Sequence, residues 1–163
     1  KVLERALKAL DRMRRHEGRT PERDLLARLQ EIAGHLRAIR LRLPAIVQER
    51  QVRLQARVNR LLESAGGGKD GVDQSRVAQE VALLADRSDV SEELTRLDSH
   101  LDQFRNFLRK SESVGRSLDF LLQEMNREVN TIGSKVGDTA VTQEIVALKA
   151  EFEKIREQVQ NVE

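Results

Sequence analysis

A chain of 163 residues is long enough for one ordinary domain, and 34% of its residues are charged whereas only 2% are aromatic. This composition, with two prolines and no apolar runs of period two, argues against a sheet. The absence of cysteine excludes disulfides, thiolate metal sites and thiol nucleophiles, and no apolar stretch approaches the roughly 20 residues that cross a bilayer. We therefore expect a cytoplasmic, all-α protein whose long antiparallel helices form a coiled-coil-like bundle.

The first 64 residues predict two helices. Apolar residues at helical spacing from Leu3 to Met13 mark the first, which should stop near Glu17-Gly18 before Thr20-Pro21-Glu22 starts the second. Pro44 interrupts the second helix and predicts a kink or a break near Leu41 to Leu43. The seam of this helix alternates spacings of three and four, as in a coiled coil, and consists of Leu25, Leu29, Ile32, Leu36, Ile39, Leu43 and Ile46.

A glycine-rich segment divides the chain. Residues 65–72 have the composition of a flexible linker, which indicates a hinge or the tip of a helical hairpin. The predicted organisation is therefore N-terminal helices over 1–64, including a long basic arm kinked near Pro44, then the linker, then a C-terminal helical domain over 73–163.

Four helices are expected after the linker. Asp73 should cap the first of them, and Asp89 with Glu92 gives an acidic capping box for the second. Gly115 precedes the third, and Gly133 and Gly137 should break the chain before the fourth. The last three seams contain Leu94, Leu97, Leu101, Phe104 and Leu108; Leu118, Leu121, Leu122, Met125, Val129 and Ile132; and Val141, Ile145, Leu148, Phe152, Ile155, Val159 and Val162. Each apolar stripe predicts core packing and carries no functional information.

A cationic stripe follows Pro44. Arg50, Arg53, Arg57 and Arg60 recur at spacings of three and four, after Arg37, Arg40 and Arg42, and Glu49 is the only acid between Ile32 and Leu62. The whole chain carries a net charge of only +2, so the basic residues are concentrated here. Arginine pairs bidentately with phosphate, which favours a nucleic-acid interface. The alternative is a solvated face, or a face that meets an acidic surface of another subunit.

Two polar patterns are candidates for chemistry. Asp89, Glu93, Arg96 and His100 share one helix face, although an offset of seven residues separates Glu93 from His100 by roughly 10 Å, so a shared metal would need further ligands. The stretch from Gly115 to Lys135 is the densest in polar residues. There, Asp119, Gln123, Asn126 and Asn130 form one stripe, and Glu124 and Glu128 form another. Carboxylates one turn apart suit hydrated Mg²⁺ or Mn²⁺, but a hydrogen-bond network between helices is the alternative.

Three separated motifs resemble the YicC/YloC family. They are Asp89-Val90-Ser91-Glu92-Glu93-Leu94-x-Arg96-Leu97-x-x-His100, then Gly115-Arg116-x-Leu118-Asp119-Phe120-x-x-Gln123-Glu124-x-Asn126-Arg127-Glu128-x-Asn130-Thr131-x-x-Ser134-Lys135, then Gln158-Val159-Gln160-Asn161-Val162-Glu163. Family members also carry an N-terminal domain, of which nothing is found in this sequence. Whether that domain supplies catalytic groups is a question that the sequence leaves open.

The resemblance implies an endoribonuclease that depends on divalent metal, acts in RNA turnover and forms a ring-like homo-oligomer, expected to be a hexamer. No membrane partner and no small-molecule cofactor is expected. The motif positions that carry over are Glu92, Glu93, Arg96, His100, Arg116, Asp119, Gln123, Glu124, Arg127, Glu128, Asn130, Lys135, Asn161 and Glu163.

Roles for these residues are assigned on chemical grounds. Mn²⁺ or Mg²⁺ is expected to be bound by Glu93, His100, Glu124 and Glu128, with Asp119 and Arg127 completing the catalytic set. The RNA-binding residues are expected to be Arg50, Arg53, Arg57, Arg60, Arg96, Arg116 and Lys135. A metal-free alternative uses His100 as general acid or base for attack by the RNA 2′-hydroxyl. Two other functions remain open: an RNA-binding adaptor that recruits another nuclease to small RNAs, and a purely structural scaffold.

Overall fold

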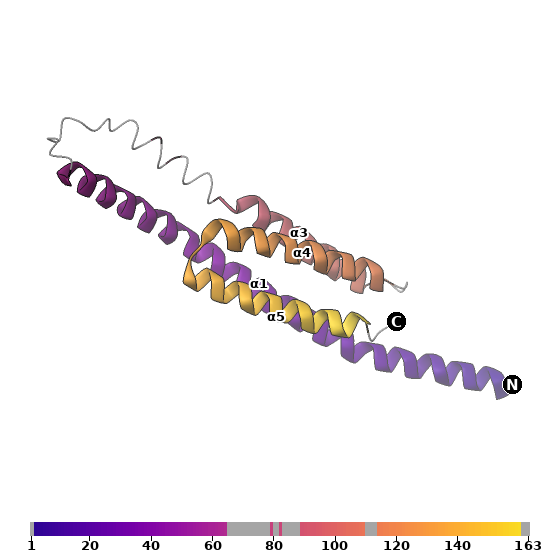
Figure 1. Cartoon of the computed structure of the whole chain (residues 1–163). Helices are drawn as coiled ribbons and strands as arrows, with labels where there is room; N and C mark the ends of the chain where they lie inside the picture. Colours follow the sequence, from indigo (N-terminus) through magenta and orange to yellow (C-terminus); the bar gives the residue numbers. More distant parts are fainter. Residues whose placement is uncertain (1, 65–78, 80–81, 83–88, 110–113, 161–163) are drawn as a thin grey trace.

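The computed structural model describes residues 2–64, 79, 82, 89–109 and 114–160, and within the first helix it describes the side chains of residues 22–60. The described chain forms four helices, α1 (Val2–Ser64), α3 (Ser91–Leu108), α4 (Gly115–Val136) and α5 (Thr139–Gln160), and contains no strand (Figure 1). The predicted all-α bundle is confirmed. The linker and the helix expected from Asp73 lie outside the described residues, apart from two isolated helical positions.

The N-terminal 64 residues contain one helix where two were predicted. α1 is continuous from Val2 to Ser64, so the expected stop near Glu17-Gly18 is wrong, and of the kink or break expected near Pro44 the break is wrong and the kink stays a prediction. A glycine inside a helix costs only about 1 kcal/mol, which is too little to end a helix by itself. At Pro44 the seam keeps its phase, because Ile39 and Ile46 are both buried and Leu43 packs against the same core. Tertiary packing therefore carries the helix past the proline.

The four helices pack in a ring in which each contacts two neighbours. α1 packs against α5 and α3, and α4 packs against α3 and α5. Figure 1 shows α1 extending beyond the other helices at both ends, while α3, α4 and α5 lie along its middle. The buried positions of α1 run from Leu25 to Ile46, so this segment is the part of α1 that belongs to the bundle.

The core is a single cluster that takes residues from all four helices. The predicted seams supply it: most of their members are buried, whereas Leu43 and Leu108 are partly buried and Val162 lies outside the described residues. The largest fully buried side chains are Leu29, Ile32, Leu36, Ile39, Leu97, Leu101, Phe104, Met125, Ile132, Leu148, Phe152 and Ile155. This shared core fixes how the polar faces of α3 and α4 are presented.

Local hydrogen bonds define the helix ends. The Asp89 carboxylate accepts hydrogen bonds from the Ser91 backbone N–H (2.9 Å) and hydroxyl (2.6 Å), which orders the residues before α3. Asp138 caps α5 by accepting from the Val141 N–H at 3.1 Å. Gly133 lies inside α4, so the break expected there is wrong, whereas Gly137 ends the helix with φ of 54°. Only a residue that tolerates the left-handed conformation fits this end easily.

A ladder of polar pairs links α1 to α5. Arg28 reaches Glu151 at 3.1 Å, His35 lies 2.6 Å from Glu144, and Arg42 reaches Asp138 at 3.1 Å. The residue numbers rise along α1 as they fall along α5, so the two helices are antiparallel. The seven-residue spacing along α1 is the heptad period, which places these pairs at the edge of the apolar seam. The ladder fixes the register of the two helices.

Candidate functional site

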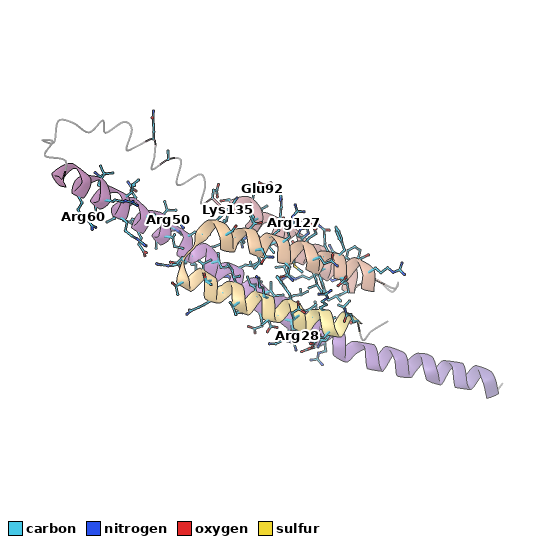
Figure 2. All side chains as sticks on the ribbon, viewed as in Figure 1. Arg28, Arg50, Arg60, Glu92, Arg127 and Lys135 are labelled. Atoms are coloured by element: carbon cyan, nitrogen blue, oxygen red, sulfur yellow. The ribbon has the colours of Figure 1, made fainter. Side chains whose placement is uncertain are left out.

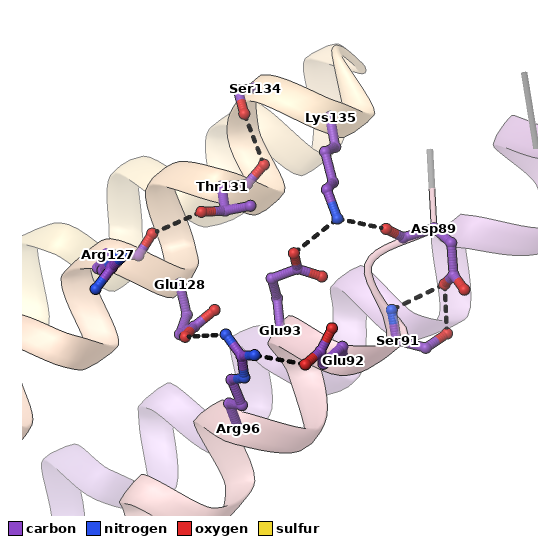
Figure 3. Close-up of polar contacts among 10 residues, drawn as sticks. All are labelled: Asp89, Ser91, Glu92, Glu93, Arg96, Arg127, Glu128, Thr131, Ser134 and Lys135. Carbon is purple, nitrogen blue, oxygen red and sulfur yellow. Dashed lines mark hydrogen bonds and ion pairs between the residues drawn. The ribbon is translucent and has the colours of Figure 1, made fainter. Parts of the chain in front are cut away.

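Two cation–carboxylate pairs join α3 to α4 in the region where the family motifs meet (Figure 3). The Lys135 ammonium donates to Glu93 Oε1 at 2.7 Å and to the Asp89 backbone carbonyl at 3.0 Å. Arg96 donates to Glu128 Oε1 at 3.2 Å and also pairs with Glu92 on its own helix. The structure therefore brings six motif positions together across the two helices: Asp89, Glu92, Glu93, Arg96, Glu128 and Lys135.

Glu93 and Glu128 are the two buried acids among the described residues, with 6% and 4% of their surfaces exposed. Burial favours the neutral form of Glu93, but the Lys135 hydrogen bond and charge, with help from Arg96, outweigh it and hold the pKa of this carboxyl below its ordinary value. The hydrogen bond that Arg96 donates to Glu128, followed by the charges of Glu92 and Glu128, raises the pKa of Arg96. The lowered pKa keeps the Glu93 carboxylate charged near neutral pH, and the two pairs bridge α3 and α4.

The expected metal ligands do not gather within one chain. No group of three or more His, Asp or Glu side chains in the described part of the protein is arranged to hold a metal ion. Two of the expected ligands, Glu93 and Glu128, face cations on the neighbouring helix. The donor set of a single chain therefore does not fit a divalent ion at Glu93, His100, Glu124 and Glu128.

The other expected catalytic groups differ in how they are held. His100 is partly buried, and its Nδ1 atom is buried without a hydrogen-bond partner. Asp119 accepts from Gln123 at 2.8 Å, and its other oxygen lies 3.5 Å from Arg156 Nε. Glu124 is partly exposed and Arg127 is exposed, and neither forms a side-chain hydrogen bond or ion pair within the chain. His100, Glu124 and Arg127 thus keep the capacity to bind a ligand.

The basic stripe lies on a part of α1 that leaves the bundle. No side chain between Val47 and Arg60 is buried, and this segment is called the α1 arm below. Figure 2 shows the arm projecting away from the other helices, with Arg60 near its far end. Arg53 has 74% of its side chain exposed and lies 3.3 Å from Glu49, and Arg57 is exposed without a partner.

The basic residues nearer the bundle have structural partners. Arg50 donates to the Val136 carbonyl, where it closes the C-terminal end of α4. Arg40 pairs with Asp98 on α3, and Arg42 pairs with Asp138 on α5. The sequence pattern grouped these arginines with the arm because Asp98, Asp138 and Val136, which they meet on other elements, lie more than 50 residues away along the chain, although Arg42 also pairs with the nearby Glu49. Only the tertiary structure separates the two sets.

The outer face of α4 was missed as a unit by the sequence reasoning. Asp119, Gln123, Asn126 and Asn130 were expected to form one stripe, and three of them, Gln123, Asn126 and Asn130, line one groove; the stripe left out Arg127 and Phe120, which are exposed on the same side of α4. The exposed residues of this face recur at spacings of four and three on the side of the helix opposite the apolar seam, so the sequence did contain the pattern. Asn161 and Glu163, the last two motif positions, lie outside the described residues.

Fold and site together define an all-helical bundle protein that carries a cationic helical arm and a polar α3–α4 face. No helix in the described part is long and apolar enough to cross a membrane. A family model described as "Endoribonuclease YicC-like, C-terminal" matches residues 39–163. The chain therefore belongs to the YicC-like endoribonuclease family, and the matched region is the family's C-terminal portion.

Curated relatives support this assignment. A protein of Clostridioides difficile named "Probable endoribonuclease YicC" is 41% identical over 162 residues, which cover 99% of this chain and 54% of the relative. A protein of Haemophilus influenzae with the same name is 40% identical over 151 residues, which cover 93% of this chain and 50% of the relative. The chain thus spans about half the length of the curated relatives it matches.

Proposed function

We propose that the full-length protein is a cytoplasmic endoribonuclease that acts in RNA turnover, and that this chain supplies its RNA-holding arm and part of its catalytic face. The observation that carries the proposal is the identity of about 40% to two relatives named as probable endoribonucleases. The exposed α1 arm supports it, because guanidinium groups along one helix bind phosphates without reading sequence. A ring-like homo-oligomer, expected to be a hexamer, would place several arms around one RNA.

Proton transfer is assigned to His100. Imidazole is the side chain that most often serves as general acid or base, and His100 is partly exposed on the α3 face that carries the family motif. Attack by the RNA 2′-oxygen on the adjacent phosphorus would break the bond to the 5′-oxygen and leave a 2′,3′-cyclic phosphate and a 5′-hydroxyl. The exposed guanidinium of Arg127 would balance the phosphate charge that develops.

Dependence on Mn²⁺ or Mg²⁺ is also proposed, on the family resemblance alone. Since the expected ligands do not gather within one chain, no chemical step is assigned to the ion. Ligands from a second chain or from the N-terminal region would have to complete such a site. Glu124 is the expected ligand that remains partly exposed and unpaired, so it is the one to test.

The adaptor function is the second candidate. It is favoured by the pairing of Glu93 and Glu128 with cations, since an adaptor needs no free carboxylates. Such a protein would bind small RNAs through the α1 arm and recruit a separate nuclease.

Cleavage of a labelled, structured RNA by the full-length protein distinguishes these functions. We expect the wild type to cut the RNA. His100→Asn and Glu124→Gln should each lose cutting and still bind RNA. Glu153→Gln is the control and should cut normally, because Glu153 is an exposed and unpaired carboxylate on α5. Loss of cutting in EDTA and its return with Mn²⁺ would support metal dependence, whereas cutting that survives EDTA would leave the metal-free route through His100. If the purified wild type bound RNA but did not cut it with any metal, the adaptor would be the remaining function. Mapping the ends of the products would test the 2′-hydroxyl route.

A further inference from the structure

The side of α4 opposite the core presents one continuous exposed stripe. Its members alternate spacings of four and three, so they lie above one another along the helix. All of them are exposed, whereas the other side of α4 supplies buried residues to the core. The stripe, called the outer face of α4, consists of Arg116, Phe120, Gln123, Arg127, Asn130 and Ser134.

A shallow groove of about 600 Å³ lies on this face. Every side chain that lines it can form hydrogen bonds, and the only charged one is an arginine. The lining residues are Gln123, Asn126, Arg127, Asn130, Thr131 and Ser134. A surface that only has to remain soluble gains nothing from several amides, so the groove has the composition of a hydrogen-bonding site.

Most of this hydrogen-bonding capacity is unused within the chain. The side chains of Arg116, Asn126, Arg127 and Asn130 form no hydrogen bond or ion pair. The hydroxyls of Thr131 and Ser134 donate to backbone carbonyls of the same helix and keep their acceptor lone pairs. In Figure 3 the dashed line at Arg127 ends on its carbonyl, and the guanidinium is joined to none of the neighbouring acids.

An exposed aromatic ring stands on the same face. Phe120 is 59% exposed, whereas Phe104 and Phe152 are fully buried and Phe107 is partly buried. The chain therefore places one of its four phenylalanines in solvent, on the stripe that carries the free amides and arginines. An exposed ring offers its face for stacking on a flat partner.

The charge of the face favours an anionic partner. The stripe contains two arginines and no acid. The acids beside it are Glu124, which is unpaired, and Asp119, which is bound to Gln123 and lies next to Arg156; Glu128 is buried against Arg96. An acidic protein surface would match the arginines but would leave the amides and the ring without specific partners.

We propose that the outer face of α4 binds the unstacked bases of single-stranded RNA, with Phe120 as the stacking platform, the amides on base edges and the arginines on phosphates. Asparagine and glutamine pair bidentately with adenine, and aromatic stacking accepts any base. From Arg116 to Ser134 the helix rises about 27 Å, which is enough for several nucleotides. This inference rests on the proposed function, and it adds that the α1 arm holds the backbone while α4 contacts the bases.

Binding of two single-stranded RNAs to the full-length protein tests the inference. One probe is a 12-nucleotide oligoadenylate, and the other has the same backbone with abasic riboses at its central positions. Affinity is measured by fluorescence anisotropy, and gels check that the RNA stays intact. Phe120→Ala should weaken oligoadenylate binding about 5- to 100-fold and leave abasic RNA unaffected, because it removes one stacking contact. Phe120→Trp should restore binding, and Asn130→Ala should reduce the preference for adenine over uridine.

Val146→Ala is the matched control, since Val146 is 63% exposed on α5 away from this face. Equal effects of Phe120→Ala on both probes, or no effect on either while the wild type binds, would overturn the inference and leave the nuclease proposal standing. A change in oligomeric mass by analytical ultracentrifugation, with no selective loss of base binding, would assign the face to a protein interface instead. Wild-type protein that binds neither probe would contradict both the inference and RNA holding by the arm. Selective base binding to these probes, together with no cutting of the structured RNA, would support the inference and sink the nuclease.

Discussion

Glu93 illustrates how a catalytic-looking residue can be structural. In the sequence Glu93 belongs to a family motif and directly precedes the seam residue Leu94. No local pattern shows which cation it pairs with. In the structure its carboxylate is buried and accepts a hydrogen bond from Lys135, 42 residues further along the chain. The pair stabilises the contact between α3 and α4, because removing Lys135 would leave the Glu93 carboxylate buried without its cation.

Replacement of Lys135 by Met should therefore destabilise the protein. We expect a loss of about 1–3 kcal/mol in the free energy of unfolding at pH 7, since the buried Glu93 carboxylate loses its partner. The pKa of Glu93 is lowered from an ordinary value of 4.5, so its contribution to stability is complete above that pH and disappears as the pH falls through the lower, folded-state value. The difference between variant and wild type should accordingly shrink in acid.

Urea unfolding at pH 7 and at pH 3.5 measures this difference. Lys149→Met is the control, because Lys149 is exposed on α5 and unpaired. A loss of stability at pH 7 that persists unchanged at pH 3.5 would show that Lys135 contributes by packing and not by its charge.

At the scale of single helices, the glycines have different roles. The residues next to them in the sequence did not show which role each glycine has. Gly34 lies inside α1 with nothing within 4 Å of an added Cβ, whereas Gly137 ends α4 with a positive φ. Gly133 was expected to break the chain, but its added Cβ would lie 3.2 Å from Ile145 Cδ1, so the glycine allows α4 and α5 to approach closely.

Alanine at the first two positions should change stability in opposite directions. Gly34→Ala should stabilise the protein by about 0.5–1 kcal/mol, because alanine is the better helix former and meets no obstacle. Gly137→Ala should destabilise it by about 1–2 kcal/mol, because alanine is strained in the left-handed conformation. Thermal unfolding of the two variants beside the wild type measures both, and shifts of the same sign would contradict the backbone assignments.

The α1 arm leads to a prediction about salt. Arg57→Gln should reduce the slope of log affinity against log salt for RNA by about 1, because one fewer counterion is released on binding. Lys149→Gln removes the same charge from α5 and should leave the slope unchanged. Titrations of full-length protein with a structured RNA between 50 and 300 mM salt provide the slopes; equal slopes for wild type and Arg57→Gln would mean that the arm does not hold phosphates.

The whole molecule depends on one core shared by helices that are distant in sequence. The buried part of α1 packs on α5 at the other end of the chain, and the polar ladder from Arg28 to Asp138 aligns the two helices. The arm is thereby held at one end of a rigid bundle, and α4 is held with its polar face outward. The α1 arm consequently keeps its position relative to α4 only while the core is intact.

Truncation of a core side chain tests how strongly the bundle depends on the shared core. Phe152→Ala should cost about 3–5 kcal/mol, because Phe152 is 1% exposed and its removal leaves a cavity among all-apolar neighbours. Val146→Ala on the outside of the same helix should change stability by less than about 0.5 kcal/mol. Chemical denaturation monitored by circular dichroism compares the two, and a small effect of Phe152→Ala would mean that α5 is not integral to the core.

The sequence by itself determined the helical class, the apolar seams and the family, because these depend on periodicity and local motifs, which a linear pattern records. It did not determine that α1 continues through Gly18 and Pro44, because a single glycine costs too little to end a helix and packing along the seam carries the helix past the proline. Nor did it separate the arginines of the arm from Arg40 and Arg42, or the bridging acids Glu93 and Glu128 from the unpaired Glu124. Those distinctions depend on which charges meet across helices, and only the tertiary structure brings residues 40 to 100 positions apart within hydrogen-bonding distance.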